Sequence, residues 1–139
     1  MLNLYELHKN PKKLEKYKKY NHLITSLIDR AYDIRYNYEV VLHIIKKSPQ
    51  LAYDYAACII KGRWPEGEST IMKNSAFTFY YARDIIKVRW HEAEADIITD
   101  PWRARDYAEN VIKDRWIEAE LIIKTNNYQW ELYCRTFKL

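Results

Sequence analysis

Three pairs of glutamates, each pair separated by one residue, have a spacing that could support acid–base chemistry. The pairs are Glu66 with Glu68, Glu92 with Glu94, and Glu118 with Glu120. Two carboxylates divide the roles of acid and base only when their surroundings separate their pKa values. These pairs recur three times in equivalent surroundings, without a nucleophile or a glycine-rich loop beside them. We therefore predict that the protein is not an enzyme.

Metal-ligating residues are also poorly placed in this sequence. The histidines are scattered, and none of them has a second histidine four residues away on the same helix face. Cys58 and Cys134 are far apart, which is typical of small residues in packed helices rather than of a zinc site. The sequence therefore predicts no metal and no cofactor.

Evenly spaced tryptophans and arginines offer a third kind of chemistry, the binding of nucleic acid. The tryptophans are Trp64, Trp90 and Trp116, and the arginines that precede them are Arg63, Arg89 and Arg115. Such a pattern can stack the bases of a single strand and contact its phosphates. Each arginine, however, also has two glutamates within five residues, and a tryptophan repeated identically is typical of interlocking repeats. We favour core packing for the tryptophans and internal Arg–Glu pairs for the arginines.

These residues belong to a segment of the chain that is written three times with a period of 26. Residues 48–73, 74–99 and 100–125 align without a gap, and neighbouring copies share ten and eleven identical positions. Self-similarity at such a period indicates stacked structural repeats. The predicted repeat core comprises Tyr55, Ile60, Trp64, Tyr81, Ile86, Trp90, Tyr107, Ile112 and Trp116.

Each repeat is predicted to form a long helix followed by a short one. The long helices should begin after residues that occupy one alignment column and favour helix N-caps: Ser48, Asn74, Asp100 and Asn126. In the first copy, Gly62 and Pro65 predict a turn between the two helices. The other copies lack both residues, so either a turn or one longer helix fits them.

The flanking segments complete a single predicted domain. Residues 126–139 form a half-repeat that closes the array, residues 22–47 read as degenerate capping helices, and residues 1–21 form a basic segment and helix. Only two glycines and four prolines occur, while 48% of the residues are hydrophobic. The predicted fold is therefore all-α, a short α-solenoid of helix-turn-helix repeats.

Charge is divided unequally along the chain. Residues 1–47 hold ten Lys/Arg against five Asp/Glu, a net +5, whereas residues 48–139 hold thirteen against fourteen, a net −1. The first helix carries a candidate basic surface of Lys12, Lys13, Lys16 and Lys19. This surface suits nucleic acid or an acidic protein, although lysines on a helix are also simply a solvated face.

Positions that differ between the copies are candidates for recognition, because repeat packing does not fix them. Aromatic residues and arginine, the types that anchor protein interfaces, occupy several of these positions in the second and third copies. The candidates are Phe77, Phe79, Tyr80, Arg83, Trp102, Arg103 and Arg105. The alternative is that several of them pack against the adjoining repeat. A homodimer through Trp130 and Phe137 of the last helix is a further hypothesis.

The repeat, from Tyr55-Ala56 through Ile59-Ile60-Lys61-Gly62-Arg63-Trp64-Pro65-Glu66, resembles an α-helical tandem repeat of bacteriophage proteins with the pattern Y-A-x-x-V-I-x-G-R-W-P-E-A-E. Most members of this group are uncharacterised. The segment from Leu4 to Leu14 is similar to a start that such proteins share. The resemblance implies a phage protein made in an infected bacterium, and it brings no catalytic residues.

These observations give two hypotheses about function. The first is a non-enzymatic phage accessory protein that binds a host protein through its repeat surface, in its narrow form an inhibitor of a host defence or transcription factor. The alternative is a nucleic-acid-binding protein that uses the lysine-rich first helix. The sequence has no apolar run long enough to span a bilayer and no signal peptide at its start, so we expect it in the host cytosol and not in a membrane.

Overall fold

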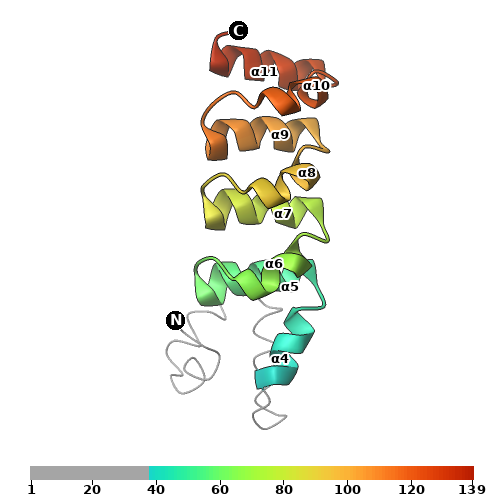
Figure 1. Ribbon diagram of the computed structural model, residues 1–139, viewed down its shortest axis with the longest axis vertical. Helices are drawn as coiled ribbons and strands as arrows, with labels where there is room; N and C mark the ends of the chain where they lie inside the picture. Colours follow the sequence, from blue (N-terminus) through green and yellow to red (C-terminus); the bar gives the residue numbers. More distant parts are fainter. Residues whose placement is uncertain (1–37) are drawn as a thin grey trace. The chain divides into compact units, whose positions relative to one another are not determined.

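The computed structural model describes residues 38–139 of the chain. Every regular element in this range is helical, which confirms the predicted all-α class for the described residues (Figure 1). The predicted helix that carries Lys12, Lys13, Lys16 and Lys19 lies outside this range, as does the first of the predicted capping helices. The chain divides into two compact units, residues 1–73 and 74–139, and the boundary falls between the first and second repeats.

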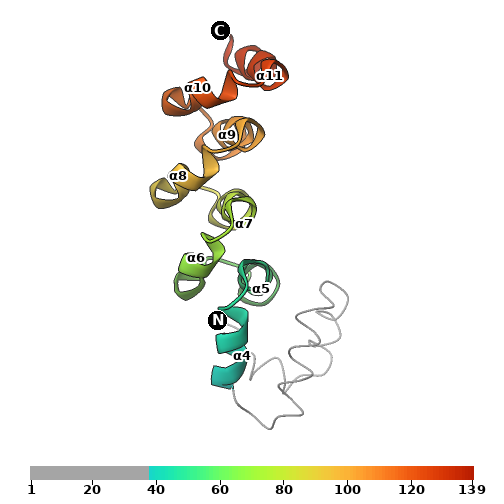
Figure 2. The same cartoon turned by 90° about the vertical axis from the view of Figure 1, so that its right-hand side faces the viewer.

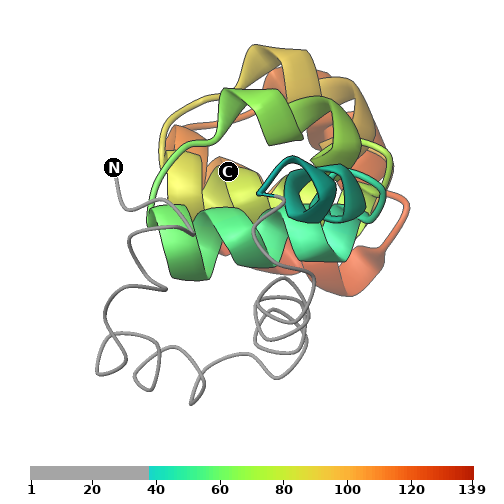
Figure 3. The same ribbon diagram turned by 90° about the horizontal axis from the view of Figure 1, so that it is seen from below.

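The described part of the first unit contains the first repeat and the helix before it. Its elements are α4 (Tyr38–Ile45), α5 (Pro49–Asp54), the π-helical segment η1 (Tyr55–Ile60) and α6 (Pro65–Ile71). Segment η1 continues α5, and α6 returns alongside α5, as the view from below shows (Figure 3). The hydroxyl of Thr70 donates a 2.8 Å hydrogen bond to the carbonyl of Lys46, which ties α6 to the end of α4.

The second unit contains the other two repeats and the closing helix. Its long helices are α7 (Ser75–Tyr81) with η2 (Ala82–Ile86), α9 (Pro101–Tyr107) with η4 (Ala108–Ile112), and α11 (Asn127–Phe137). Its short segments are η3 (His91–Ala93) with α8 (Glu94–Ile97), and η5 (Ile117–Ala119) with α10 (Glu120–Ile123). Within this unit α7, α9 and α11 form one row, and α8 and α10 form another (Figure 2).

The four predicted N-caps are confirmed, and they fix where each long helix begins. The side chain of Asp100 accepts a 2.9 Å hydrogen bond from the amide of Arg103, and that of Asn126 accepts a 3.1 Å bond from the amide of Gln129. Asn74 accepts from two amides, and Ser48 makes the weakest bond, at 3.4 Å. Each cap satisfies amides of the first turn that have no partner within the helix.

A break between the long and short helices is present in all three repeats, so the alternative of one continuous helix in the second and third is wrong. In each copy the chain turns at a lysine with a left-handed backbone; the φ angles are 56° at Lys61, 60° at Lys87 and 60° at Lys113. The glycine at position 62 has no positive φ, so it is not the residue that ends the helix.

The ends of the long helices explain why a lysine can take this position. The amide of Lys87 donates to the carbonyl of Ala82 at 2.8 Å, and that of Lys113 donates to Ala108 at 2.7 Å. Both bonds span five residues, as in a π-turn, and in the first copy the amide of Lys61 donates to the carbonyl of Ala56 in the same way. A left-handed conformation costs a residue with a side chain about 1 to 2 kcal/mol, so the surrounding packing must impose it.

Aromatic side chains form the centre of each repeat. The predicted core tyrosines and tryptophans are buried in every copy, with Tyr81 and Tyr107 at 0% exposure and Trp116 at 2%. Within a repeat the two rings touch, with centroids 4.8, 5.5 and 5.2 Å apart in successive copies. The isoleucines predicted beside them are only half-buried: Ile60, Ile86 and Ile112. None of the helices in the described part of the chain has the length and apolar character needed to cross a bilayer.

Candidate interaction surface

Tyrosine hydroxyls join each repeat of the second unit to the next one. The backbone amide of Trp90 donates to the hydroxyl of Tyr107 at 2.7 Å, and the amide of Trp116 donates to Tyr133 at the same distance. Burial raises the pKa of Tyr107 to about 12. The sequence predicted these tyrosines as core rings but missed the role of the hydroxyl. The available signal was Tyr133, which continues the tyrosine column past the last tryptophan.

The arginines of the repeated Arg-Trp pair bind carboxylates of their own repeat. The shortest nitrogen–oxygen distances are 2.6 Å for Arg63 with Glu68, 2.7 Å for Arg89 with Glu94 and 2.6 Å for Arg115 with Glu120. The predicted Arg–Glu pairs are thus present in all three copies. Each arginine of the row is thus paired with a carboxylate, which offsets the positive charge that phosphate binding depends on.

The second glutamate of each pair is the one that binds the arginine. Glu120 shows this most clearly, because it is only 8% exposed and accepts from Arg115. The hydroxyl of Tyr133 also approaches it at 3.5 Å. The first glutamates of the pairs, by contrast, are exposed: Glu66, Glu92 and Glu118.

Phe79, a predicted partner-binding residue, lies in the core. It is 0% exposed, and its ring meets the edge of Trp102 with centroids 5.2 Å apart. The guanidinium of Arg83 lies over the rings of Phe79 and Tyr80, at 5.0 and 5.2 Å from their centroids. Phe79 is therefore not accessible to a partner, because the next repeat covers it. Phe77 and Tyr80 are half-buried, and Trp102 is 38% exposed.

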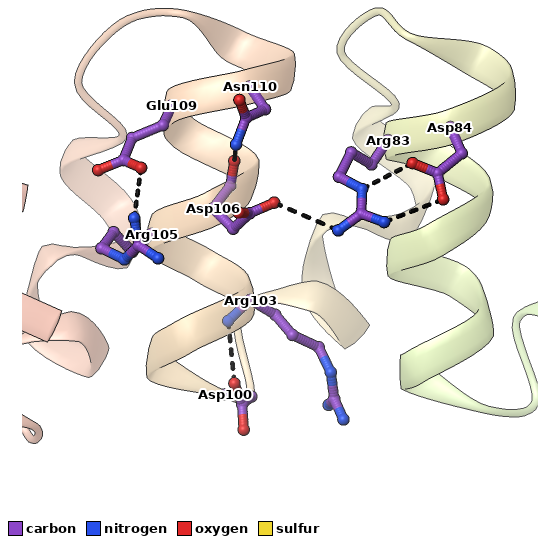
Figure 4. Close-up of polar contacts among 8 residues, drawn as sticks. All are labelled: Arg83, Asp84, Asp100, Arg103, Arg105, Asp106, Glu109 and Asn110. Carbon is purple, nitrogen blue, oxygen red and sulfur yellow. Dashed lines mark hydrogen bonds and ion pairs between the residues drawn. The ribbon is translucent and has the colours of Figure 1, made fainter.

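The three candidate arginines of the long helices also contact the adjoining repeat. Arg83 pairs with Asp84 of its own helix at 2.6 Å and lies 3.8 Å from Asp106 of the next repeat (Figure 4). Arg103 donates to the hydroxyl of Ser75 at 3.1 Å, and Arg105 donates to the side-chain amide oxygen of Gln129 at 2.7 Å. Phe79 and these three arginines thus take part in packing between repeats, while Phe77, Tyr80 and Trp102 keep part of their surface exposed.

Other exposed apolar side chains lie on the short segments of the third repeat and on the linker before Arg89. Val88, Ile117 and Leu121 are 62%, 67% and 77% exposed. They are not among the predicted partner-binding residues. Comparison of their columns could have found them, because Ile117 and Leu121 replace His91 and Ala95 of the second repeat.

The closing helix presents a polar outer side. In α9, the columns of Arg105 and Glu109 face α11; the corresponding residues of α11 are Glu131 and Arg135, an exposed ion pair at 3.1 Å. The ring of Trp130 stacks on Tyr133 and lies 4.3 Å from the ammonium group of Lys124. The ring of Phe137 packs on Tyr133 at 4.7 Å. The two aromatic residues named for a homodimer are thus engaged within the unit.

No cluster of three or more residues able to hold a metal ion occurs within residues 38–139. Comparisons of the chain with protein-family models, with curated protein sequences and with solved structures find no match.

Proposed function

We propose that this protein is a non-enzymatic binding module, in which tandem helical repeats form a short α-solenoid that binds another protein. The observation that carries this proposal is the exposure of large apolar side chains on the third repeat and the closing helix. They are Trp102, Ile117, Leu121, Tyr128 and Leu139. A partner that covers such side chains removes apolar surface from water, which stabilises the complex.

The polar residues support a scaffold rather than a catalyst. The glutamates suited to acid–base work are bound by arginines at 2.6 to 2.7 Å, and the arginines of the long helices bond to neighbouring repeats. A catalytic group needs a partner in a cleft and a pKa matched to its task. Within residues 38–139, one glutamate of each pair is bound by an arginine, and the other is exposed on the surface.

The origin and target belong to the same proposal. The resemblance of the repeat to bacteriophage tandem-repeat proteins supports a phage accessory protein that acts in the cytosol of the infected bacterium. Its target would be a host protein, and in the narrow form the interaction inhibits a host defence or transcription factor.

The second candidate function is nucleic-acid binding, which the charge division favours. Residues 1–47 carry a net +5, and Lys12, Lys16 and Lys19 lie on one predicted helix. The repeats themselves argue against it, because their net charge is −1 and their arginines are paired.

A tagged pull-down from host bacterial lysate, with and without nuclease, separates the two candidates. One stoichiometric protein that survives nuclease and 300 mM salt supports the binding module. The triple variant Lys12→Glu, Lys16→Glu, Lys19→Glu should retain that protein. Bound material that vanishes with nuclease, and that the triple variant no longer captures, would establish the nucleic-acid function instead.

A further inference from the structure

The closing helix α11 carries a tryptophan where the long helices of the repeats carry a small buried residue. This alignment column holds Ala52, Thr78 and Ala104, each at 0% exposure. In every repeat the short helix packs against the long helix of the same repeat. Because such an interior is close-packed, a much larger side chain would not fit at this column. In α11 the same column holds Trp130, which is half-buried.

Trp130 covers a tyrosine that a different tryptophan covers in the repeats. In the third repeat, the ring of Tyr107 contacts Trp116, which precedes the short segment, with centroids 5.2 Å apart. The equivalent residue of α11 is Tyr133, which is also at 0% exposure. Its ring contacts Trp130 at 5.5 Å, in a stacked arrangement, and Phe137 at 4.7 Å. Trp130 thus does for Tyr133 what Trp116 does for Tyr107, from within the same helix.

A second change at the same junction holds the indole in place. Lys124, at the end of α10, occupies the column of Ile98. Its ammonium group lies 4.3 Å from the centroid of the Trp130 ring and 3.9 Å from a carboxylate oxygen of Glu120. A cation over an indole is attracted by the quadrupole of the ring. The second repeat has an isoleucine and the third an alanine at these two columns, so this contact cannot form where those repeats meet.

The last turn of α11 also differs from the last turn of the repeats. The amide of Lys113 donates to the carbonyl of Ala108, five residues before it, in a π-turn. The amide of Lys138 donates to the carbonyl of Cys134, four residues before it, as in an ordinary α-helix. Ala108 and Cys134 share a column, so the left-handed lysine comes one residue earlier in α11. Helix α11 therefore lacks the π-turn that leads into each short segment.

We propose that Trp130 is a lid that closes the α11 end of the helix row against a second copy of this protein. A second copy carries the same helices that pack together in this row, so it is the natural occupant of an open end. With the lid in place, Tyr133 is already covered, and the side that continues the row presents the exposed ion pair of Glu131 and Arg135. Terminal units with a polar outer face keep repeat proteins soluble. The lid concerns self-association and not the partner proposed above, so either proposal can fail without the other.

Amide hydrogen exchange tests whether Trp130 shields the tyrosine. The variant Trp130→Ala should speed exchange of the Trp116 amide, which donates to the hydroxyl of Tyr133, at least tenfold. The amide of Trp90, one repeat away, should change less than twofold. Trp130→Phe keeps a ring in place and should leave exchange at Trp116 within threefold of the wild type. Equal acceleration at Trp90 and Trp116, or none at Trp116, would overturn the lid.

Light scattering tests whether the lid prevents self-association. The double variant Lys124→Ile, Trp130→Ala copies the columns of Ile98 and Ala104, so the same backbone already accommodates both residues. We expect the wild type to remain a 16.9 kDa monomer up to about 300 µM, and the double variant to dimerise as its concentration rises. The matched control Trp102→Ala removes a tryptophan from the neighbouring long helix and should stay monomeric.

Two outcomes of this experiment would overturn the proposal. A wild-type dimer that Trp130→Ala makes monomeric would show that the indole is itself the interface. A folded double variant that stays monomeric would show that the end is closed without the lid. The single variant Trp130→Thr, which copies Thr78, opens the end in a second way and gives the same measurement if the double variant does not fold.

Discussion

The second and third repeats of this protein share one scaffold and differ in what they show to solvent. In both, the long helix ends at a left-handed lysine, and the next tryptophan donates its backbone amide to a tyrosine of the following repeat. In both, the Arg-Glu pair spans five residues. On the outer side, however, the second repeat carries His91 and Ala95 and the third carries Ile117 and Leu121.

This comparison of the two repeats separates the positions that pack against a neighbour from the positions that stay exposed. Variation in the long helices is absorbed by contacts between repeats: the second repeat meets the third through Phe79 and Trp102, and the third meets the closing helix through Arg105 and Gln129. On the short segments, by contrast, the outer variable side chains are exposed in both repeats. If the buried parts of the two repeats are equivalent, matched substitutions in them should have matched effects on stability.

The largest effect is expected from removing the shared tryptophans. Trp116→Ala and Trp90→Ala should each lower the free energy of unfolding by about 3 to 5 kcal/mol, because a buried indole leaves a cavity. Urea denaturation followed by circular dichroism measures the loss. The control His91→Ala should change the free energy by less than about 0.5 kcal/mol. A cost for Trp90→Ala below about 1 kcal/mol would show that the two repeats are not equivalent.

Removing one hydroxyl should have the next largest effect. Tyr107→Phe and Tyr133→Phe keep the ring but leave the amide of Trp90 or Trp116 without its acceptor, which costs about 1 to 3 kcal/mol. Amide hydrogen exchange at the same tryptophan should accelerate. The control is Tyr128→Phe on the exposed face, which should be neutral. An unchanged rate of amide exchange at Trp90 in Tyr107→Phe would contradict a stabilising hydrogen bond between these two repeats.

The same hydroxyl predicts a dependence of stability on pH. Burial raises the pKa of Tyr107 from its ordinary value of 10.0 to about 12, so the folded state favours the neutral phenol. Its contribution is fully present below pH 10 and is lost as pH rises through about 12. The free energy of unfolding should therefore fall more steeply between pH 10 and 12 in the wild type than in Tyr107→Phe. Parallel curves for the two proteins would refute the shift.

The smallest effect concerns the left-handed lysines. Lys87→Gly and Lys113→Gly should each raise the free energy of unfolding by up to about 1 kcal/mol, because glycine adopts a positive φ without steric cost. Lys124→Gly is the control: that lysine has a φ of −62°, so glycine should stabilise nothing there. Destabilisation by Lys87→Gly would mean that the lysine side chain itself contributes to the turn.

Several features could be predicted from the sequence because their causes are local. An N-cap acts within three residues, so Asp100 and Asn126 could be assigned from position alone. An Arg–Glu pair within five residues is similarly local. The period of 26 predicted which columns recur and therefore which aromatic residues fill each repeat.

Other features depend on a neighbour 17 or more residues away along the chain, and only the tertiary structure decided them. The column of Phe79 suited either a partner or the adjoining repeat, and the contact with Trp102 of the next repeat shows that it packs inside. No glycine or proline near Ile86 predicts the helix break that follows it. The break is held by the π-turn bond of Lys87 and by the hydrogen bond from the amide of Trp90 to the hydroxyl of Tyr107. The exposure of Ile117 and Leu121 also depends on which face the short segment turns inward. The sequence alone thus defines the repeats, because their causes are local. The contacts between successive repeats of residues 74–139 determine which variable residues are buried and which remain exposed.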